Sequence, residues 1–407
     1  MSGKGKMNIQ HRKNSDRDAL AVYDLAAQVD PRCKGFSGAV FDGKYVYYVP
    51  LNNGAFQGVV TRCDTEGDFA NAQSWACYDT TQVDAASKGF VNGVFDGRYL
   101  YLVPYNNGAQ FGQVTRYDTQ ADFASATSWQ VYDTTQVHPK SKGFVGGVFD
   151  GRFVYLVPYQ LDYTTHHGQV TRYDTEGDFT QATSWEVYDM TRSHRDCIGY
   201  HTGLFDGRFV YFCPYLRSPQ PPEYASQVTR YDTRSAFTES QSWEVFDAIR
   251  AHPNSKGFIG SVFDGRFVYF VPYQNGHERY GQVTRYDTQT GFADERSWEV
   301  FDSSQIDASS RGFFGAVFDG RFIYFTPHCK AQNVYHGQVT RYDTQGDFTS
   351  AASWKICDTA EEYPNNKGFI GGTFDGRFVY LPPFETEENK HSGQTVRIDT
   401  HAPGIWK

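Results

Sequence analysis

Apolar and polar positions follow one pattern that recurs along the chain every 54 to 58 residues. The triplet Phe-Asp-Gly marks the period, and it begins at Phe41, Phe95, Phe149, Phe205, Phe263, Phe318 and Phe374. An arginine followed two residues later by aspartate comes after each triplet, and six of the repeats then carry Ser-Trp. Self-similarity at such a period predicts an architecture of repeated units that pack on their neighbours.

Each repeat contains four strand patterns, which the third repeat shows well. "GFVGGVFD" from Gly143 and "RFVYLVPY" from Arg152 flank an Asp-Gly turn signal, and "GQVTRYDT" and "SWEVYD" follow. The second pattern is apolar on both faces, as a strand must be when it is covered on both sides. Seven units of four antiparallel strands predict an all-β fold, a seven-bladed β-propeller.

The two ends of the chain predict how the ring closes. The last repeat stops after its third strand pattern, and an unmatched fourth pattern, "LAVYDL", begins at Leu20. We expect Ala21 to Asp24 to form the outermost strand of the last blade, which would remove exposed sheet edges. The glycine-rich first strand is expected to be the innermost one. Residues 19–407 then form a single domain, and residues 1–18 form a polar, flexible tail.

On these repeated signatures the chain resembles the seven-bladed β-propeller superfamily over nearly its whole length. Its period is longer than that of WD40 repeats and somewhat longer than that of kelch repeats, and the Gly-His and Trp-Asp signature of WD40 is absent. The pattern matches no single characterised family. The resemblance implies a kelch-like or WD40-like architecture, of the kind that repeat lectins use, and it implies no particular activity.

Composition narrows the classes of partner. Aromatic residues make up 17 % of the 407 residues, and the formal net charge is -9, which argues against non-specific binding of nucleic acid. Seven cysteines without a Cys-x-x-Cys spacing predict free thiols in a reducing compartment. No signal-peptide pattern or membrane-spanning run is present. We therefore expect a monomer without membrane association or cofactor, cytoplasmic or released without a classical signal peptide.

One repeated set of side chains points to a ligand. The start of the first strand, the end of the second and the start of the third meet on one face of the ring, and there a cation, an aromatic ring and an amide recur. The sets in blades 2, 3 and 5 are Lys88, Tyr105 and Gln113; Lys142, Tyr159 and Gln169; and Lys256, Tyr273 and Gln282. Such a trio suits a sugar or another small polar ligand, because the ring stacks and the polar groups hydrogen-bond.

Blade 4 departs most from the repeat. Its first strand follows the segment "SHRDCIGYHTG", and we expect His194, Arg195, Tyr200 and His201 to form a possible axial site. Histidine, tyrosine and arginine are the groups that eliminative cleavage of an acidic polysaccharide needs. Asp162, Asp196 and Glu223 are candidate carboxylates for hydrolysis instead. His194, Cys197, His201 and Cys213 can each ligate zinc, but their spacing fits no standard site, and we predict no metal.

Three functions remain open on the sequence. The first is a multivalent carbohydrate-binding propeller with repeated sites on the loop face, in which several weak sites act together. The second is a polysaccharide-active enzyme, a lyase or glycosidase, with one site near the central channel at blade 4. The third is a protein-interaction scaffold.

One ion pair is also predicted within each blade. In blade 3 we expect the third-strand arginine, Arg172, to pair with the fourth-strand aspartate, Asp189.

Overall fold

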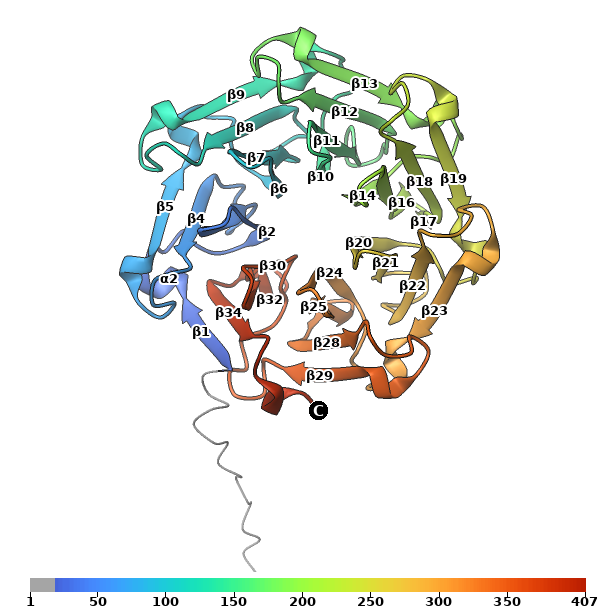
Figure 1. Cartoon of the computed structure of the whole chain (residues 1–407). Coiled ribbons are helices and arrows are strands. Elements are labelled where there is room, and N and C mark those ends of the chain that lie inside the picture. Colours follow the sequence, from blue (N-terminus) through green and yellow to red (C-terminus); the bar gives the residue numbers. More distant parts are fainter. Residues whose placement is uncertain (1–18) are drawn as a thin grey trace, which may run out of the picture.

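The computed structural model describes residues 19–407, which form seven four-stranded antiparallel sheets around a central axis (Figure 1). The prediction of a seven-bladed β-propeller is confirmed. The flexible tail expected at residues 1–18 lies outside the described residues. No helix between residues 19 and 407 is long and apolar enough to cross a membrane.

The strands of each blade run from the axis outward in chain order. Blade 1 contains β2 (Phe36–Phe41), β3 (Tyr45–Pro50), β4 (Val59–Asp64) and β5 (Trp75–Asp79). Blade 2 contains β6 (Phe90–Phe95), β7 (Tyr99–Pro104), β8 (Gln113–Asp118) and β9 (Trp129–Asp133). Blade 3 contains β10 (Phe144–Phe149), β11 (Phe153–Pro158), β12 (Gln169–Asp174) and β13 (Trp185–Asp189). Blade 4 contains β14 (Tyr200–Phe205), β15 (Phe209–Pro214), β18 (Gln227–Asp232) and β19 (Trp243–Asp247).

The remaining blades follow the same order, and the last one includes a strand from the other end of the chain. Blade 5 contains β20 (Phe258–Phe263), β21 (Phe267–Pro272), β22 (Gln282–Asp287) and β23 (Trp298–Asp302). Blade 6 contains β24 (Phe313–Phe318), β25 (Phe322–Pro327), β28 (Gln338–Asp343) and β29 (Trp354–Asp358). Blade 7 contains β30 (Thr373–Phe374), β31 (Phe378–Leu381), β34 (Gln394–Asp399) and, outermost, β1 (Leu20–Asp24).

Small elements complete the blades. Three hairpins extend the loops between the second and third strands: β16 (Leu216–Pro219) with β17 (Pro222–Tyr224), β26 (Cys329–Ala331) with β27 (Val334–Tyr335), and β32 (Glu385–Glu387) with β33 (Lys390–His391). One α-helical turn, α2 (Leu25–Gln28), follows β1. Short 3-10 turns flank the outer strands at Ala72–Ser74, Thr80–Gln82, Ala126–Ser128, Thr134–Gln136, Ala182–Ser184, Met190–Arg192, Ser240–Ser242, Ala248–Arg250, Glu295–Ser297, Ser303–Gln305, Ala351–Ser353 and Pro403–Ile405.

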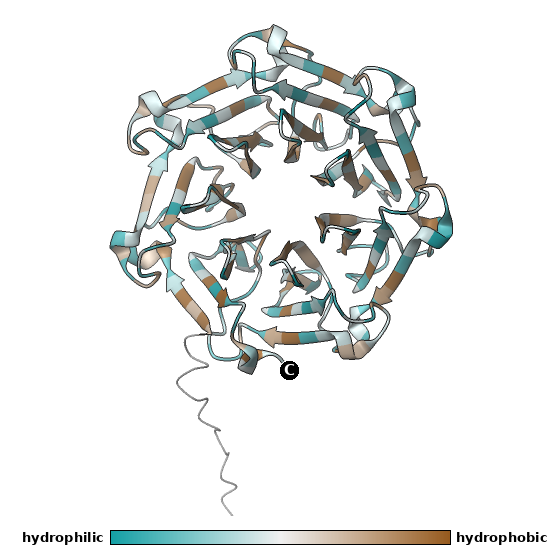
Figure 2. Cartoon of the chain, in the orientation of Figure 1, coloured by the Kyte–Doolittle hydropathy of each residue, from teal (hydrophilic) through white to brown (hydrophobic). Residues whose placement is uncertain are grey.

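The closing strand pairs as the sequence predicts. Leu20 of β1 lies opposite Ile398 of β34, and Asp24 lies opposite Gln394, in antiparallel register. The second strands are covered on both faces, and their side chains are buried along the whole strand after its first residue. Figure 2 shows the resulting apolar bands on the blades, with polar positions between them.

An arginine in the third strand joins each blade to the next. In blade 3, the guanidinium of Arg172 lies between the ring of Phe153, 4.0 Å away, and the ring of Phe237 of blade 4, 4.1 Å away. Its charge is paired with Glu186 of β13 at 2.5 Å. The expected partner, Asp189, lies opposite Gln169 and instead accepts hydrogen bonds from the backbone and hydroxyl of Thr191. The prediction of an Arg172–Asp189 ion pair is therefore wrong, because the strand register places Glu186 across from Arg172.

Each blade begins with a glycine whose backbone lies very close to another backbone segment. Gly89 has a φ of +76°, and a Cβ atom there would lie 1.8 Å from the carbonyl oxygen of Asn106. Its N–H donates to the carbonyl of Gln57 in the preceding blade. Only glycine combines this backbone conformation with so close an approach. These glycines fix the loop face, because each one ties the inner hairpin of its own blade to the neighbouring blade.

The cysteines are free thiols throughout residues 19–407, as predicted. Six of the seven are buried, and Cys77 is partly exposed. Cys33 and Cys77 are hydrogen-bonded to one another, which raises the pKa of the Cys33 thiol and lowers that of Cys77.

Candidate axial binding site

A ring of side chains surrounds the axis where the second strands end. In blades 1 to 6 the residue after the proline that ends the second strand lines a cavity of about 230 Å³, and in blade 7 the residue after Pro383 does so. These seven residues are Leu51, Tyr105, Tyr159, Tyr215, Tyr273, His328 and Phe384. Six of the seven are aromatic, and the same repeat position therefore builds one shared wall around the axis.

The aromatic side chains lie at nearly equal steps. The centroids of Tyr105 and Tyr159 are 6.2 Å apart, those of Tyr159 and Tyr215 are 6.1 Å apart, and those of Tyr215 and Tyr273 are 6.1 Å apart. The steps from Tyr273 to His328 and from His328 to Phe384 are 6.0 and 6.2 Å. We call this set, from Tyr105 to Phe384, the aromatic arc. Distances of this size allow favourable aromatic contacts between neighbours.

A second tier of side chains closes the cavity from below. In blades 1 to 6 it comes from the second residue of the inner strand, and in blade 7 from Ile370, which precedes β30; the other members are Ser37, Val91, Val145, His201, Ile259 and Phe314. Because this position alternates with the buried Phe or Tyr before it, the side chain points to the axis rather than into the blade. His201 has the only imidazole of this tier and belongs to the divergent blade 4.

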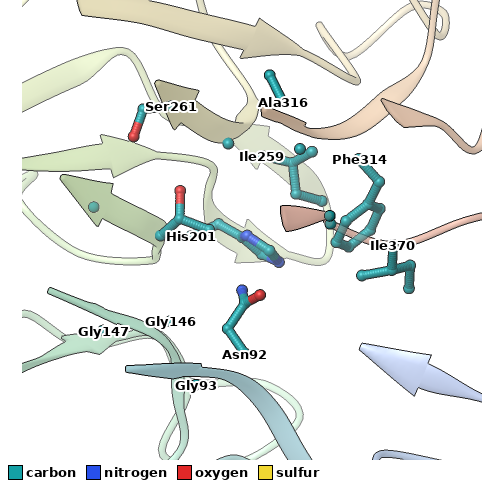
Figure 3. Close-up of a pocket in the computed structure, with 16 residues that line it drawn as sticks. Asn92, Gly93, Gly146, Gly147, His201, Ile259, Ser261, Phe314, Ala316 and Ile370 are labelled. Atoms are coloured by element: carbon teal, nitrogen blue, oxygen red, sulfur yellow. The ribbon is translucent and has the colours of Figure 1, made fainter. Parts of the chain in front are cut away.

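A smaller cavity of about 170 Å³ continues along the axis beneath this tier. It shares His201, Ile259, Phe314 and Ile370 with the upper cavity, and Figure 3 shows the imidazole of His201 and the amide of Asn92 pointing into the same space. The backbones of neighbouring inner strands nearly touch here. A Cβ atom on Gly315 would lie 3.0 Å from the Cα atom of Gly371, so small residues are required.

The side chains that line the cavity are uncharged, and the guanidinium of Arg279 lies 3.9 Å from the ring centroid of Tyr273. Burial lowers the pKa of His201 to about 3, and that of His328 to about 3, so both imidazoles are neutral near pH 7. The Nδ1 atoms of His201 and His328 are buried without a hydrogen-bond partner within residues 19–407. A ligand atom in the cavity can satisfy such a group, and a buried polar atom without a partner is costly.

Three of the predicted binding residues meet at this cavity. Tyr105, Tyr159 and Tyr273 all belong to the aromatic arc, and Tyr159 and Tyr273 are only 8 % and 6 % exposed. The three tyrosines thus face one common space. This arrangement favours one shared site over a separate site in each blade.

The other members of the predicted trios do not line the cavity in the described part of the chain. Gln113 donates to the hydroxyl of Ser87 at 3.2 Å, and Gln282 donates to that of Ser255 at 3.4 Å. Gln169 is buried, whereas Lys88, Lys142 and Lys256 are half-buried. The glutamine at this position therefore supports the start of the inner strand in blades 2 and 5.

The structure separates the four residues of the possible axial site. His201 faces the axis, but Tyr200 points into the core of blade 4, where its hydroxyl lies 2.6 Å from the hydroxyl of Thr229. His194 and Arg195 are exposed, and Arg195 lies 3.6 Å from Asp196. Adjacent residues of a strand point to opposite sides, so Tyr200 and His201 cannot both face the channel.

Two residues of blade 4 contact the same hydroxyl group. Cys197 stands where blades 2, 3, 5 and 6 have Ser87, Ser141, Ser255 and Ser310, although blade 1 also has a cysteine there, Cys33, and Tyr200 stands where the other blades have phenylalanine. The Sγ atom of Cys197 and the hydroxyl of Tyr200 both contact the hydroxyl of Thr229. Both side chains thus serve packing within the blade.

The groups considered for catalysis are engaged elsewhere. Asp196 and Glu223 both pair with Arg217, and Asp162 caps its own loop by accepting from Thr164 and Thr165. His201, with a pKa of about 3, is a weak proton acceptor near neutral pH. Within residues 19–407 no three His, Cys, Asp or Glu side chains are grouped to hold a metal ion.

Sequence reasoning missed Tyr215 of the aromatic arc and every member of the second tier except His201. Tyr215 was missed because blade 4 was considered for its loop, although it follows Pro214 as Tyr159 follows Pro158. The second tier could have been found from the alternation of the inner strand, which buries one residue and turns the next to the axis.

Comparison with known proteins supports the fold alone. No family model matches the chain, and no curated protein matches it. The solved WD40 domain of Pan2 from Neurospora crassa is similar over 91 % of this chain and 90 % of that chain, at 9 % identity and a TM-score of 0.53. A second similar structure is PorZ of Porphyromonas gingivalis, described as a surface component of the type-IX secretion system, with 10 % identity and a TM-score of 0.49. The similarity covers 91 % of this chain but 38 % of PorZ. By fold, the chain is a seven-bladed β-propeller.

Proposed function

We propose that this protein is a carbohydrate-binding propeller whose principal site is the axial cavity. The aromatic arc carries the proposal, because apolar faces of a pyranose stack on aromatic rings. Tyr105, Tyr159, Tyr215, Tyr273 and Phe384 supply five such rings around one space.

Polar atoms of the cavity suit the hydroxyls of a sugar. The Nδ1 atoms of His201 and His328 are buried and have no hydrogen-bond partner within residues 19–407. Each hydrogen bond contributes about 1 kcal/mol and each ring contact about 0.5–1.5 kcal/mol. A few such contacts give a dissociation constant in the range of about a millimolar to a micromolar.

This proposal keeps the sugar ligand and the tyrosines of the sequence prediction but gives them one site. One ligand per chain is expected, since the tyrosines of different blades share a cavity. A glycan array with the purified protein identifies the sugar class, and calorimetric titration with the best glycan measures the stoichiometry. A stoichiometry of one supports the axial site, and three or more equivalent ligands would instead support separate sites in the blades.

Leucine replacements test the arc with little damage to the fold. Leu51 occupies the equivalent position in blade 1, so Tyr105→Leu, Tyr159→Leu and Tyr273→Leu have a precedent within the ring. The triple variant should bind the array-selected glycan at least tenfold more weakly while it still unfolds in one cooperative transition, at a lower temperature because buried ring contacts are lost. Tyr363→Ala, which changes an exposed tyrosine, is the matched control. Unchanged glycan binding by the triple variant would refute the proposal.

A further inference from the structure

Blade 1 interrupts the aromatic arc. Of the seven equivalent positions around the axis, the one in blade 1 has an aliphatic side chain, Leu51. Its neighbours around the ring are Tyr105 of blade 2 and Phe384 of blade 7. The side chain that forms the wall of the axial cavity is therefore smaller at blade 1 than at any other blade.

A second cavity begins at this gap. It has a volume of about 400 Å³. Leu51, Tyr105 and Phe384 line both this cavity and the axial cavity. Its other lining residues come from the hairpin loops of blades 1 and 7: Asn52, Gly54, Phe56, Glu385, Asn389 and His391. We call it the side groove. Because Leu51, Tyr105 and Phe384 line both, the two cavities lie side by side at blade 1.

The side groove repeats the chemistry of a sugar subsite. Phe56 offers a half-buried ring, and Asn52 and Asn389 offer amides. The carboxylate of Glu385 is held in place, because it accepts from the hydroxyl of Tyr335 at 2.5 Å and lies 3.5 Å from Nδ1 of His391. One aromatic platform beside oriented amide and carboxylate groups can bind hydroxyls of a second ring.

We propose that the protein binds the end of a linear oligosaccharide, with the terminal unit in the axial cavity and the next unit in the side groove above blade 1. This inference rests on the proposed function. The chain leaves sideways because the cavity below is smaller, about 170 Å³, and is bounded by strand backbones. Leu51 sets the exit, since an aromatic side chain there would complete the wall.

Three oligomer series test this arrangement by calorimetry: glucose, cellobiose and cellotriose; N-acetylglucosamine, chitobiose and chitotriose; and galacturonic acid with its dimer and trimer. In at least one series the dimer should bind about tenfold more tightly than the monomer, and the trimer should add little. Leu51→Tyr should abolish the gain of the dimer while the affinity for the monomer stays within twofold. Phe56→Ala should have the same selective effect.

Gln110→Ala is the matched control, because Gln110 is the equivalent of Phe56 in blade 2 and does not line the side groove. It should bind monomer and dimer as the wild type does. A monomer that binds without any gain from the dimer would overturn the side groove and leave the proposed function standing. If neither the glycan array nor any of these series yields a sugar that binds the wild type, the proposed function falls, and this inference falls with it.

Discussion

The ring of Tyr23 stacks on the indole of Trp75, with centroids 5.8 Å apart and planes inclined by 13°. Between other blades an outer-strand aromatic makes the same contact with the next tryptophan, as Tyr188 does with Trp243 at 4.6 Å and 10°. Tyr23 belongs to β1, the strand that the N-terminal end of the described chain adds to blade 7. The joint between blades 7 and 1 is thus built like its neighbours.

Deletion of residues 1–26 should destabilise the whole ring. It removes β1, leaves the edge of β34 without a partner and takes the stacking ring from Trp75. We expect aggregation or a fall of the melting temperature by more than 10 °C, measured by circular dichroism and light scattering. Deletion of residues 1–18 alone, which retains β1, is the control. A truncated protein that melts like the full chain would show that closure does not depend on β1.

Stability should decline as the pH falls from 7 to 5, because buried histidines resist protonation. Burial lowers the pKa of His167, His201, His328 and His336 to about 3 and that of His166 to about 4. Histidines of the unfolded chain take up protons near pH 6.5. Below that pH, proton binding therefore lowers the free energy of unfolding by on the order of 1 kcal/mol for each buried histidine. This loss continues until the pH reaches the folded pKa values.

Urea unfolding at pH 7, 6 and 5 measures the slope of the free energy of unfolding against pH. His336→Gln should reduce it, and Gln57 stands at the equivalent position in blade 1, so the ring accepts glutamine there. His194→Gln, at an exposed histidine, should keep the wild-type slope. Equal stability at pH 7 and 5 would contradict the neutral state of the buried imidazoles.

Cys77 should be the first thiol to react with an alkylating reagent in the native protein. It is partly exposed, and its hydrogen bond with Cys33 lowers its pKa, whereas the other six thiols are buried. Mass spectrometry after brief treatment with iodoacetamide should find one label at Cys77. After unfolding without reductant, all seven positions should be labelled. Two or more positions that stay unlabelled in the unfolded chain would indicate a disulfide.

Thr202→Gly should stabilise the protein. Thr202 has a φ of +75°, which a β-branched residue adopts at a cost of about 1–3 kcal/mol, and Gly38, Gly146 and Gly315 occupy equivalent positions in other blades. We expect a gain of about 1 kcal/mol in the free energy of unfolding. Thr202→Ala keeps the unfavourable φ and should give no gain. A less stable glycine variant would mean that the threonine side chain makes a contact worth more than the strain.

Ring closure and the order of strands could be read from the chain because they depend on local patterns. Both faces of the second strand are apolar in blade 3: one face has Phe153, Tyr155 and Val157, and the other has Val154 and Leu156. Such a strand must be covered by other sheets on both faces, whichever residues those sheets contain. The missing fourth strand after residue 399 and the spare strand at Leu20 could only complete one another. Free cysteines followed in the same way, from their place in apolar strand positions.

Pairings across strands depended on register, which the sequence leaves open. Arg172 meets Glu186 rather than Asp189 because β12 and β13 align Gln169 with Asp189, and a shift of one residue changes every partner. The prediction that Tyr200 and His201 are both axial failed for a different reason: adjacent residues of a strand point to opposite sides, so only His201 faces the channel.

The sequence by itself determined which side chains recur: a tyrosine after the second strand of blades 2, 3, 4 and 5, and a leucine in blade 1. Only the tertiary structure decided that these recurrences form one cavity rather than several, because seven-fold closure brings equivalent positions of different blades to a common axis. Residues separated by a whole repeat become neighbours about 6 Å apart at their ring centroids, as Tyr159 and Tyr215 are. Proximity of that kind arises from the curvature of the ring, which no single repeat encodes.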